Sequence, residues 1–213
     1  MKDVIEAVGD STEQGARVAG LVLAAGAARR FGSPKQLATL DGRPLLEHAL
    51  AAVTAAGLDR VVVVLGSCAE QVLAGIDLQG AEAMRSERWS EGQAASLACG
   101  LEYLADGRPG AVVIALGDQP ALSPAAITRV LGARGQASAV RATYGGTPGH
   151  PVVIEAALFP ALCAATGETG AREVLRATGV CAVACDDLGG GADVDTPAQL
   201  TALRFPCPTG VTE

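Results

Sequence analysis

The chain has 213 residues, which suits one domain, and it is 49% hydrophobic but only 3% aromatic, so Ala, Val and Leu must form its core. Its net charge of −7, without a basic stripe or an aromatic platform, argues against a nucleic-acid-binding protein. The longest apolar runs have the length of strands and fall far short of the roughly 20 residues of a membrane-spanning helix.

The two ends of the chain differ from its middle. Residues 1–16 are charged and lack the apolar stretch of a signal peptide, so we expect a disordered lead, then a single domain over 17–205 and a similar tail over 206–213. The six cysteines form no CxxC pair, and with only two histidines they give no zinc-ligand spacing. We therefore expect reduced thiols and a cytoplasmic protein.

Strand-like and helix-like runs alternate from residue 18 onward. Apolar or alternating runs predict strands at residues 18–24, 60–65, 81–84, 111–116, 137–143, 151–154 and 180–184. Helical patterns and start signals predict helices at 44–56, 68–74, 92–104, 124–133, 156–164, 171–178 and 197–203. This alternation predicts a three-layer α/β fold with a mostly parallel sheet, which binds its ligand beyond the carboxyl ends of the strands.

A basic loop follows the first predicted strand. Residues 26–35, GAARRFGSPK, carry Arg29, Arg30 and Lys35 and no acid. Gly26 lets the backbone approach a ligand, turn N–H groups bind phosphate oxygens, and the cations offset the charge of a polyphosphate. Lys35 is one of only two lysines, which indicates a place where a compact point charge is favoured over a guanidinium. The alternative is a basic surface loop that keeps an acidic protein soluble.

The common nucleotide-binding fingerprints are missing from this loop. GxGxxG needs glycines two residues apart, and the sequence after Gly26 is Ala-Ala. No GK[ST] follows the strand either, so the Walker pattern is absent. The loop is therefore a phosphate loop of another kind.

Two acidic positions are expected at the same sheet edge. Asp118 directly follows the apolar run 111–116, and Asp195 precedes the final predicted helix. Mg²⁺ is commonly held by one or two carboxylates together with phosphate oxygens and water, so these two side chains are candidate metal ligands. The alternatives are a turn-forming aspartate before Pro120 and a helix N-cap at Asp195 or Thr196.

Three further segments are expected near this edge. Residues 144–151, YGGTPGHP, predict a tight loop that covers a substrate, and His150 in it is equally well explained as a packed structural residue. Residues 90–96 open a helix and offer backbone N–H groups, with Ser96 either a ligand contact or a small packing residue. Gly66 and Ser67 follow the second predicted strand.

Six segments, in order, resemble the MobA-like nucleotidyltransferases, most closely their molybdenum cofactor cytidylyltransferase branch. They are LAAGAARRFGSPK at 23–35, GQAAS at 92–96, GDQP at 117–120, PGHPV at 148–152, GARE at 170–173 and DVDTP at 193–197. The resemblance implies a Rossmann-like fold that joins a nucleoside monophosphate to a phosphorylated acceptor and releases pyrophosphate. It covers residues 18–203.

The resemblance also implies roles for individual residues. Lys35, Arg30 and Asp118 are the expected catalytic residues, and Asp118 and Asp195 the expected Mg²⁺ ligands. The expected nucleotide-binding residues are Leu23, Ala24, Ala25, Gly26, Arg29, Arg30, Lys35, Gly66, Ser67 and Ser96. Gly149, His150 and Pro151 are expected to bind the acceptor.

The implied activity is transfer of CMP from CTP to the terminal phosphate of molybdopterin, with a molybdenum hydroxylase apoenzyme as a possible partner. Ala-Ala-Gly at 24–26, where guanylyl relatives tend to carry Ala-Gly-Gly, and Asp195, often Asn in them, favour the cytidylyl branch. Three alternatives remain open: a transferase for guanylate or for another phosphorylated acceptor, a non-catalytic accessory protein that binds the finished cofactor, and a nicotinamide- or flavin-dependent oxidoreductase.

Overall fold

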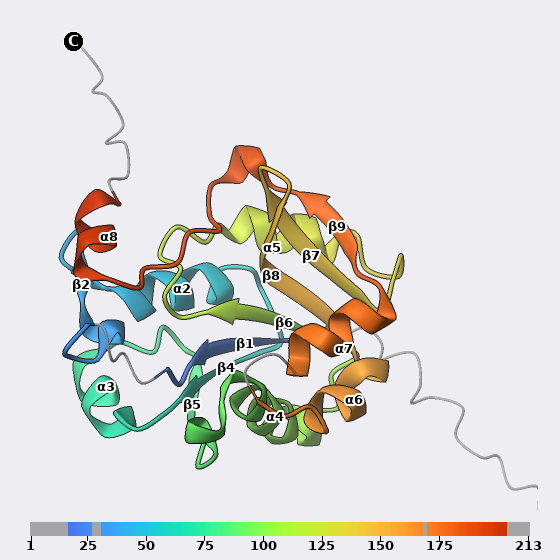
Figure 1. Ribbon diagram of the computed structural model, residues 1–213, viewed down its shortest axis with the longest axis horizontal. Helices are drawn as coiled ribbons and strands as arrows, with labels where there is room; N and C mark the ends of the chain where they lie inside the picture. Colours follow the sequence, from blue (N-terminus) through green and yellow to red (C-terminus); the bar gives the residue numbers. More distant parts are fainter. Residues whose placement is uncertain (1–16, 27–30, 168–169, 204–213) are drawn as a thin grey trace, which may run out of the picture.

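A computed structural model of the chain describes residues 17–26, 31–167 and 170–203 (Figure 1). Its centre is a seven-stranded sheet in the order β5-β4-β1-β6-β8-β7-β9. The strands are β1 (Val18–Ala24), β4 (Arg60–Leu65), β5 (Glu82–Arg85), β6 (Ala111–Leu116), β7 (Ala139–Tyr144), β8 (Thr147–Glu155) and β9 (Cys181–Ala184). A short separate ribbon joins β2 (Thr39–Leu40) and β3 (Arg43–Pro44).

The sheet is mostly parallel, with one strand reversed. β1 pairs in parallel with β4 and β6, β4 with β5, and β7 with β9, whereas β8 runs antiparallel to both β6 and β7. The central strands β1, β4 and β6 are buried almost throughout, as continuously apolar strands covered on both faces should be.

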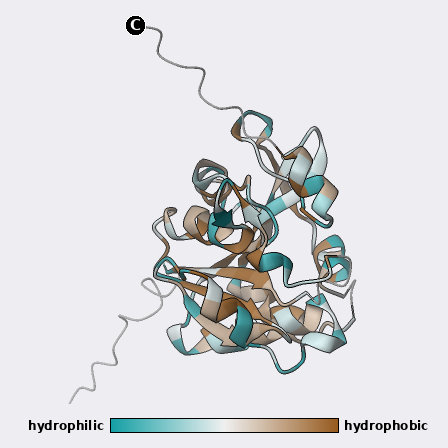
Figure 2. Cartoon of the chain, turned by 90° about the vertical axis from the view of Figure 1, so that its left-hand side faces the viewer, coloured by the Kyte–Doolittle hydropathy of each residue, from teal (hydrophilic) through white to brown (hydrophobic). Residues whose placement is uncertain are grey.

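Helices cover both faces of this sheet. They are α2 (Leu45–Thr54), α3 (Ala69–Gly75), α4 (Gln93–Leu104), α5 (Pro124–Leu131), α6 (Phe159–Cys163), α7 (Gly170–Thr178) and α8 (Pro197–Ala202). One hydrophobic cluster joins the sheet to α2, α3 and α5, and a second joins its opposite face to α4, α6 and α7 (Figure 1). Hydrophobic residues concentrate on the central strands between these layers (Figure 2). The predicted three-layer α/β fold is confirmed.

One predicted loop is largely a strand. The segment 144–151 was expected to be a covering loop, but only Gly145 and Gly146, at φ of 56° and 75°, make the turn between β7 and β8. Positive φ at both central residues is what a tight two-residue hairpin requires. Residues 149–151 belong to β8, in an irregular stretch where its register with β7 shifts.

Because β8 is antiparallel, its first residues lie at the edge where β6 and β7 end. The start of β8 therefore reaches the edge at which a ligand was expected. Within the described part of the chain, no helix combines the length and apolarity needed to cross a bilayer.

Candidate functional site

The site is built where β1 and β6 end. Gly117 follows β6, and a Cβ on it would lie 2.9 Å from the Cβ of Ala24 on β1, so glycine allows these two strand ends to sit close together. The backbone N–H of Val194 donates to the carbonyl oxygen of Asp118 at 3.0 Å. That bond ties the segment before α8 to the end of β6, which explains how Asp195 reaches Asp118 from 77 positions away in the sequence (195 minus 118).

A short 3₁₀ turn, Lys35–Leu37, places the lysine. The next residue, Gln36, is buried and its amide nitrogen donates to the carbonyl oxygen of Ala24 at 2.6 Å, which fixes the turn to the end of β1. The side chain of Lys35 then crosses the strand ends. Its Nζ donates to Asp118 Oδ2 at 2.5 Å, to Asp195 Oδ1 at 3.0 Å and to the carbonyl oxygen of Val194 at 3.4 Å.

These three side chains were expected to share one site, and their proximity is confirmed. Lys35 and Asp118 are mostly buried, with side-chain exposures of 15% and 19%, while Asp195 is more open at 46%. Burial lowers the pKa of Lys35, but its ion pairs with the two carboxylates outweigh burial and raise that pKa above its ordinary value. The ammonium is therefore a permanent positive charge at neutral pH.

The carboxylates also suit a divalent cation. Asp118 Oδ1 is buried and accepts no hydrogen bond from any described residue, so it lacks a partner that a bound cation could supply. Among the described residues, no group of three or more His, Cys, Asp or Glu side chains gathers as a metal cage. Two carboxylates without a cage fit Mg²⁺, which keeps water and phosphate oxygens as most of its ligands.

A third acid lies close to this pair. Asp193 accepts a hydrogen bond from Gln119 Nε2 at 2.6 Å. Burial raises the pKa of Asp193, and the negative charges of Asp118 and Asp195 raise it further. Asp193 does not contact Lys35, but its charge adds to that of the two paired carboxylates, which favours an additional cation at the site.

A cavity of about 800 Å³ opens over these residues. Eight of the residues expected to bind nucleotide or metal line it, namely Leu23, Ala24, Ala25, Gly26, Lys35, Ser96, Asp118 and Asp195. On its other side lie Trp89, Ser90, Gly92 and Gln93, which lead into α4. The volume lies within the range of about 300–1,000 Å³ that is common for small-molecule sites.

Some expected residues have other positions. Gly66 and Ser67 are not part of the lining of this cavity. A Cβ on Gly66 would lie 2.3 Å from the carbonyl oxygen of Ala25, so this glycine permits the close packing of the β4 and β1 ends. Arg29 and Arg30 lie outside the described residues.

A second cavity, of about 710 Å³, adjoins the first. The two share Gln93, Leu116, Asp118 and Arg172 in their linings. Of the three residues predicted to bind the acceptor, Gly149 and His150 line the second cavity and Pro151 does not. Burial lowers the pKa of His150 to about 4, with a smaller effect from neighbouring Arg141 and Arg172, so the ring is neutral at neutral pH.

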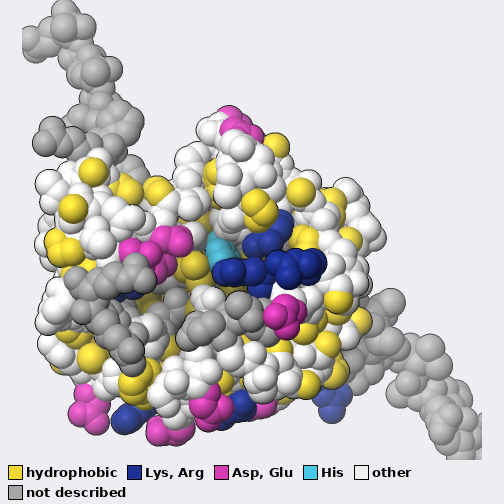
Figure 3. Space-filling model, viewed as in Figure 1, with side chains coloured by type: hydrophobic (Ala, Val, Ile, Leu, Met, Phe, Trp, Pro, Cys, Tyr) yellow, Lys and Arg dark blue, Asp and Glu magenta, His cyan; other side chains and the backbone are white. Residues whose placement is uncertain are grey.

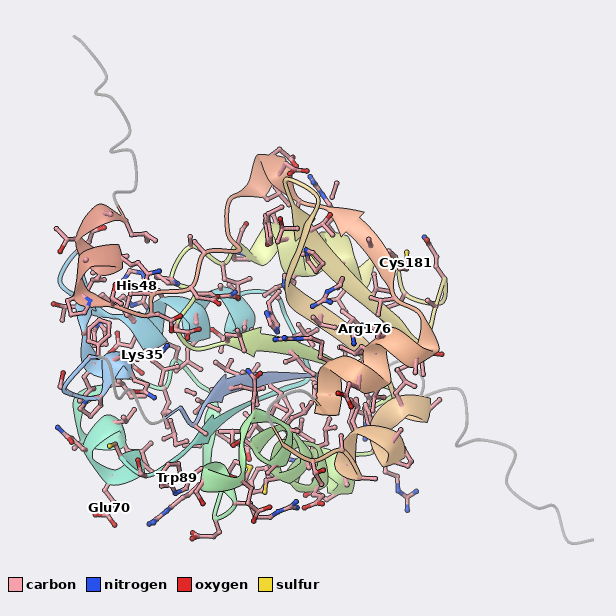
Figure 4. All side chains as sticks on the ribbon, viewed as in Figure 1. Lys35, His48, Glu70, Trp89, Arg176 and Cys181 are labelled. Carbon is pink, nitrogen blue, oxygen red and sulfur yellow. The ribbon has the colours of Figure 1, made fainter. Side chains whose placement is uncertain are left out.

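Several cavity residues were not singled out from the sequence. They are Trp89, Gln36 and Gln93 in the first cavity and Arg141, Arg176, Gln119 and Asp193 in the second. Basic side chains gather beside a histidine on this face, with acidic side chains to their left (Figure 3). Lys35 and Arg176 come from elements on opposite sides of the face (Figure 4). The sequence could have drawn attention to Trp89 only because it is the single tryptophan of the chain.

Comparison with known proteins adds relatives to this geometry. The chain is 35% identical over 197 residues to the nicotine blue oxidoreductase of Paenarthrobacter nicotinovorans, which covers 87% of this chain and 96% of that protein. The crystal structure of Rv0371c from Mycobacterium tuberculosis H37Rv superposes with a TM-score of 0.78 at 30% identity, over 87% of this chain and 96% of that one. A manganese complex of Rv0371c gives a TM-score of 0.74 at 28% identity, over 87% and 97% of the two chains.

The MobA-like NTP transferase domain matches residues 20–183, which is most of the chain and contains Lys35, Asp118 and both cavity walls built by β1 and β6. Together with the fold and the relatives above, this match assigns the chain to the MobA-like NTP transferase family, as a nucleotidyltransferase.

Proposed function

We propose that the chain transfers CMP from CTP to the terminal phosphate of molybdopterin and releases pyrophosphate. The observation that carries the proposal is the grouping of Lys35, Asp118 and Asp195 within 3.0 Å contacts at the junction of two cavities. One cavity is large enough for a nucleotide, and the other for the organic part of an acceptor.

In the proposed reaction, an oxygen of the acceptor phosphate attacks the α-phosphorus of CTP. A new P–O bond forms there while the bond from the α-phosphorus to the bridging oxygen of the β-phosphate breaks, and pyrophosphate leaves with both bonding electrons. A phosphate monoester is already largely ionised at neutral pH, so no general base is needed. Catalysis then depends on positioning and on compensation of negative charge.

The residues of the site divide these tasks. Lys35 supplies a permanent positive charge toward the phosphates, and we expect Arg30, with weaker support from Arg29, to neutralise the pyrophosphate. Asp118 and Asp195 would hold Mg²⁺ through their carboxylate oxygens. When bound, Mg²⁺ would neutralise charge on the phosphoryl oxygens. The manganese complex of Rv0371c supports a divalent cation in a related protein.

The backbone of residues 23–26 and the segment from Trp89 to Ser96 would enclose the base and ribose. The choice of cytosine rests on the resemblance at residues 24–26 and at Asp195. Thermal-shift measurements with CTP, GTP, ATP and UTP, each with Mg²⁺, test it directly. A larger shift with GTP than with CTP would exclude the cytidylyl assignment.

The proposed setting is the cytoplasm, with a molybdenum hydroxylase apoenzyme as the recipient of the product. The decisive assay combines purified molybdopterin, CTP and Mg²⁺ and measures pyrophosphate release. We expect release that requires all three components and is abolished in Lys35→Ala. No release from any nucleotide in the presence of molybdopterin would overturn the proposal.

A second candidate function follows from one relative. The nicotine blue oxidoreductase matches over nearly its whole length, so an oxidoreductase on this scaffold is the alternative to nucleotidyl transfer. Against it, residues 26–28 lack the GxGxxG spacing of a dinucleotide loop. A nicotinamide or flavin cofactor that binds the protein and is consumed in a redox assay, without pyrophosphate release, would favour this alternative.

A further inference from the structure

Strand β7 places one cation on the face of the sheet that carries Ala139. Val140 and Ala142 pack into the cluster shared with α5, and Ala139 packs into the cluster on the opposite face. Since successive side chains of a strand alternate between faces, Arg141 belongs to the same face as Ala139, beneath α7. A guanidinium therefore lies on the same face as Ala139, next to the apolar cluster that includes α7.

Arg141 is only partly compensated there. Its Nε is buried and has no hydrogen-bond partner among the described residues. Burial lowers the pKa of Arg141 below its usual value, and the positive charge of Arg172 lowers it further. A buried donor without a partner and a repelled cation both raise the free energy of the ligand-free protein.

Helix α7 brings two more guanidiniums to the same cavity. Arg172 and Arg176 are four residues apart, so they project from one face of the helix, and both line the second cavity with Arg141. Figure 4 shows Arg176 between α7 and the sheet. Within the described residues, no ion pair joins any of these three side chains to a carboxylate. The cavity therefore concentrates positive charge in a chain whose net charge is −7.

His150 lies in the same cavity but does not add to its positive charge. Because its pKa is lowered to about 4, the ring adds no fourth positive charge at neutral pH and keeps one donor and one acceptor nitrogen. The Tyr144 hydroxyl donates to the backbone carbonyl oxygen of His150 at 3.0 Å, which helps to hold this stretch of β8.

We propose that Arg141, Arg172 and Arg176 form the binding site for the phosphate monoester of the acceptor. The assignment rests on the proposed nucleotidyl transfer and adds to it a place and a set of ligands for the attacking group. A dianionic phosphate supplies oxygens that can accept hydrogen bonds from the three guanidiniums and balance their positive charge. The organic part of such an acceptor would lie against the apolar side chains of Leu175 and Val180 in the same cavity.

The shared residues favour this phosphate over those of the nucleotide. Arg172 lines both cavities, so a phosphate bound to it lies at the junction, beside Asp118. This is where an attacking oxygen must meet the α-phosphorus. The first cavity has a cation outside this cluster in Lys35, which contacts Asp118 and does not line the second cavity.

The test measures binding of a simple phosphate monoester, phenyl phosphate, by calorimetry while the nucleotide cavity is filled with the non-reactive analogue cytidine 5′-(α,β-methylene)triphosphate and Mg²⁺. We expect phenyl phosphate to bind the analogue-loaded protein, and Arg141→Leu and Arg172→Ala each to bind it about 10- to 100-fold more weakly, because each removes a charge-assisted contact. Analogue affinity should change little in Arg141→Leu.

Arg129→Ala is the matched control. Arg129 is exposed on α5, pairs with Asp187 through both guanidinium nitrogens, and lines neither cavity, so this variant makes the same change in net charge away from the site. We expect it to bind phenyl phosphate like the wild type. Binding that is equally weak in the control would mean that only the overall charge matters, which overturns the assignment.

Two other results would also overturn the assignment. One is unchanged phenyl phosphate affinity in Arg141→Leu, and the other is competition between phenyl phosphate and the analogue, which would place the arginines on the triphosphate. Neither result needs molybdopterin or turnover, and the effect of Arg141→Leu on phenyl phosphate affinity can also be measured without the cytidine analogue, so the two proposals can fail separately. Folding of Arg141→Leu is checked by thermal unfolding, where loss of the buried cation should raise the midpoint of the ligand-free protein.

Discussion

Asp118→Asn is the sharpest test of the proposed catalytic site because it removes a charge with little change in shape. The carboxylate uses Oδ2 to accept a hydrogen bond from Lys35 and leaves Oδ1 buried without a partner among the described residues. An asparagine can turn its oxygen toward the ammonium and keep that bond. Its NH₂ group then occupies the position of Oδ1, where it cannot bind a metal ion.

The structure sets the expected size of the effect. At 2.5 Å, the Lys35–Asp118 attraction has a gross Coulomb energy of about 6–7 kcal/mol at an effective dielectric constant of about 20. Desolvation of two largely buried groups offsets most of it, and Lys35 keeps Asp195, so we expect a loss of stability of about 1–2 kcal/mol. Turnover should fall by about 10²–10³-fold, because a preorganised charge at the phosphoryl group is lost.

The assay follows pyrophosphate release over a titration of Mg²⁺, with thermal unfolding as the check on folding. Asp106→Asn is the matched control, since Asp106 is 75% exposed, pairs with Arg60 at 2.7 Å and lines neither cavity. We expect the Asp118 variant to need far more metal and the control to behave like the wild type. Turnover within about threefold of wild type at ordinary Mg²⁺ concentration would refute the catalytic role of Asp118.

Three further predictions follow from single residues. Trp89 is the only tryptophan and lines the first cavity, so CTP should change the intrinsic fluorescence saturably; an unchanged spectrum at concentrations that stabilise the protein would remove the nucleotide from this cavity. Gly66→Ala should lower stability by about 2 kcal/mol because its Cβ would lie 2.3 Å from the Ala25 carbonyl oxygen. Gly26→Ala would place its Cβ where no described atom lies within 4 Å, so it should leave stability unchanged and weaken CTP binding. Equal unfolding midpoints for the two variants would contradict this. The pKa of His150 is lowered from 6.5 to about 4, so the unfolded chain binds more protons between these pH values and stability should fall by up to about 3 kcal/mol as pH drops from 6.5 to 4. In chemical denaturation, His150→Asn should lose this part of the pH dependence. Identical pH profiles for the variant and the wild type would exclude His150 as its source.

Much of the fold follows from the sequence because its central strands have a simple physical signature. The runs 60–65 and 111–116 are apolar throughout, and the structure gives β4 and β6 the same bounds. Strand ends that share an edge also explain why Lys35 and Asp118, 83 residues apart, could be expected at one site.

The reversed strand β8 could not be predicted in the same way. Three glycines and two prolines in YGGTPGHP favour a long loop, yet two glycines suffice for the turn and the remaining residues extend a strand. The arginine cluster was missed for a related reason. Arg141 and Arg176 line one cavity only because of the register of β7 and the position of α7, which depend on tertiary contacts that no local pattern encodes.

The reversed direction of β8 also means that different parts of the chain line the two cavities. The strand residues that line the first cavity belong to the parallel strands β1 and β6. The β7–β8 hairpin and α7 supply much of the lining of the second cavity. If the second cavity binds the acceptor as proposed, substitutions in the β7–β8 hairpin can change which molecule receives the transferred group without altering the strand ends that line the first cavity. With this arrangement, related proteins could come to use different acceptors through a few substitutions around the β7–β8 hairpin.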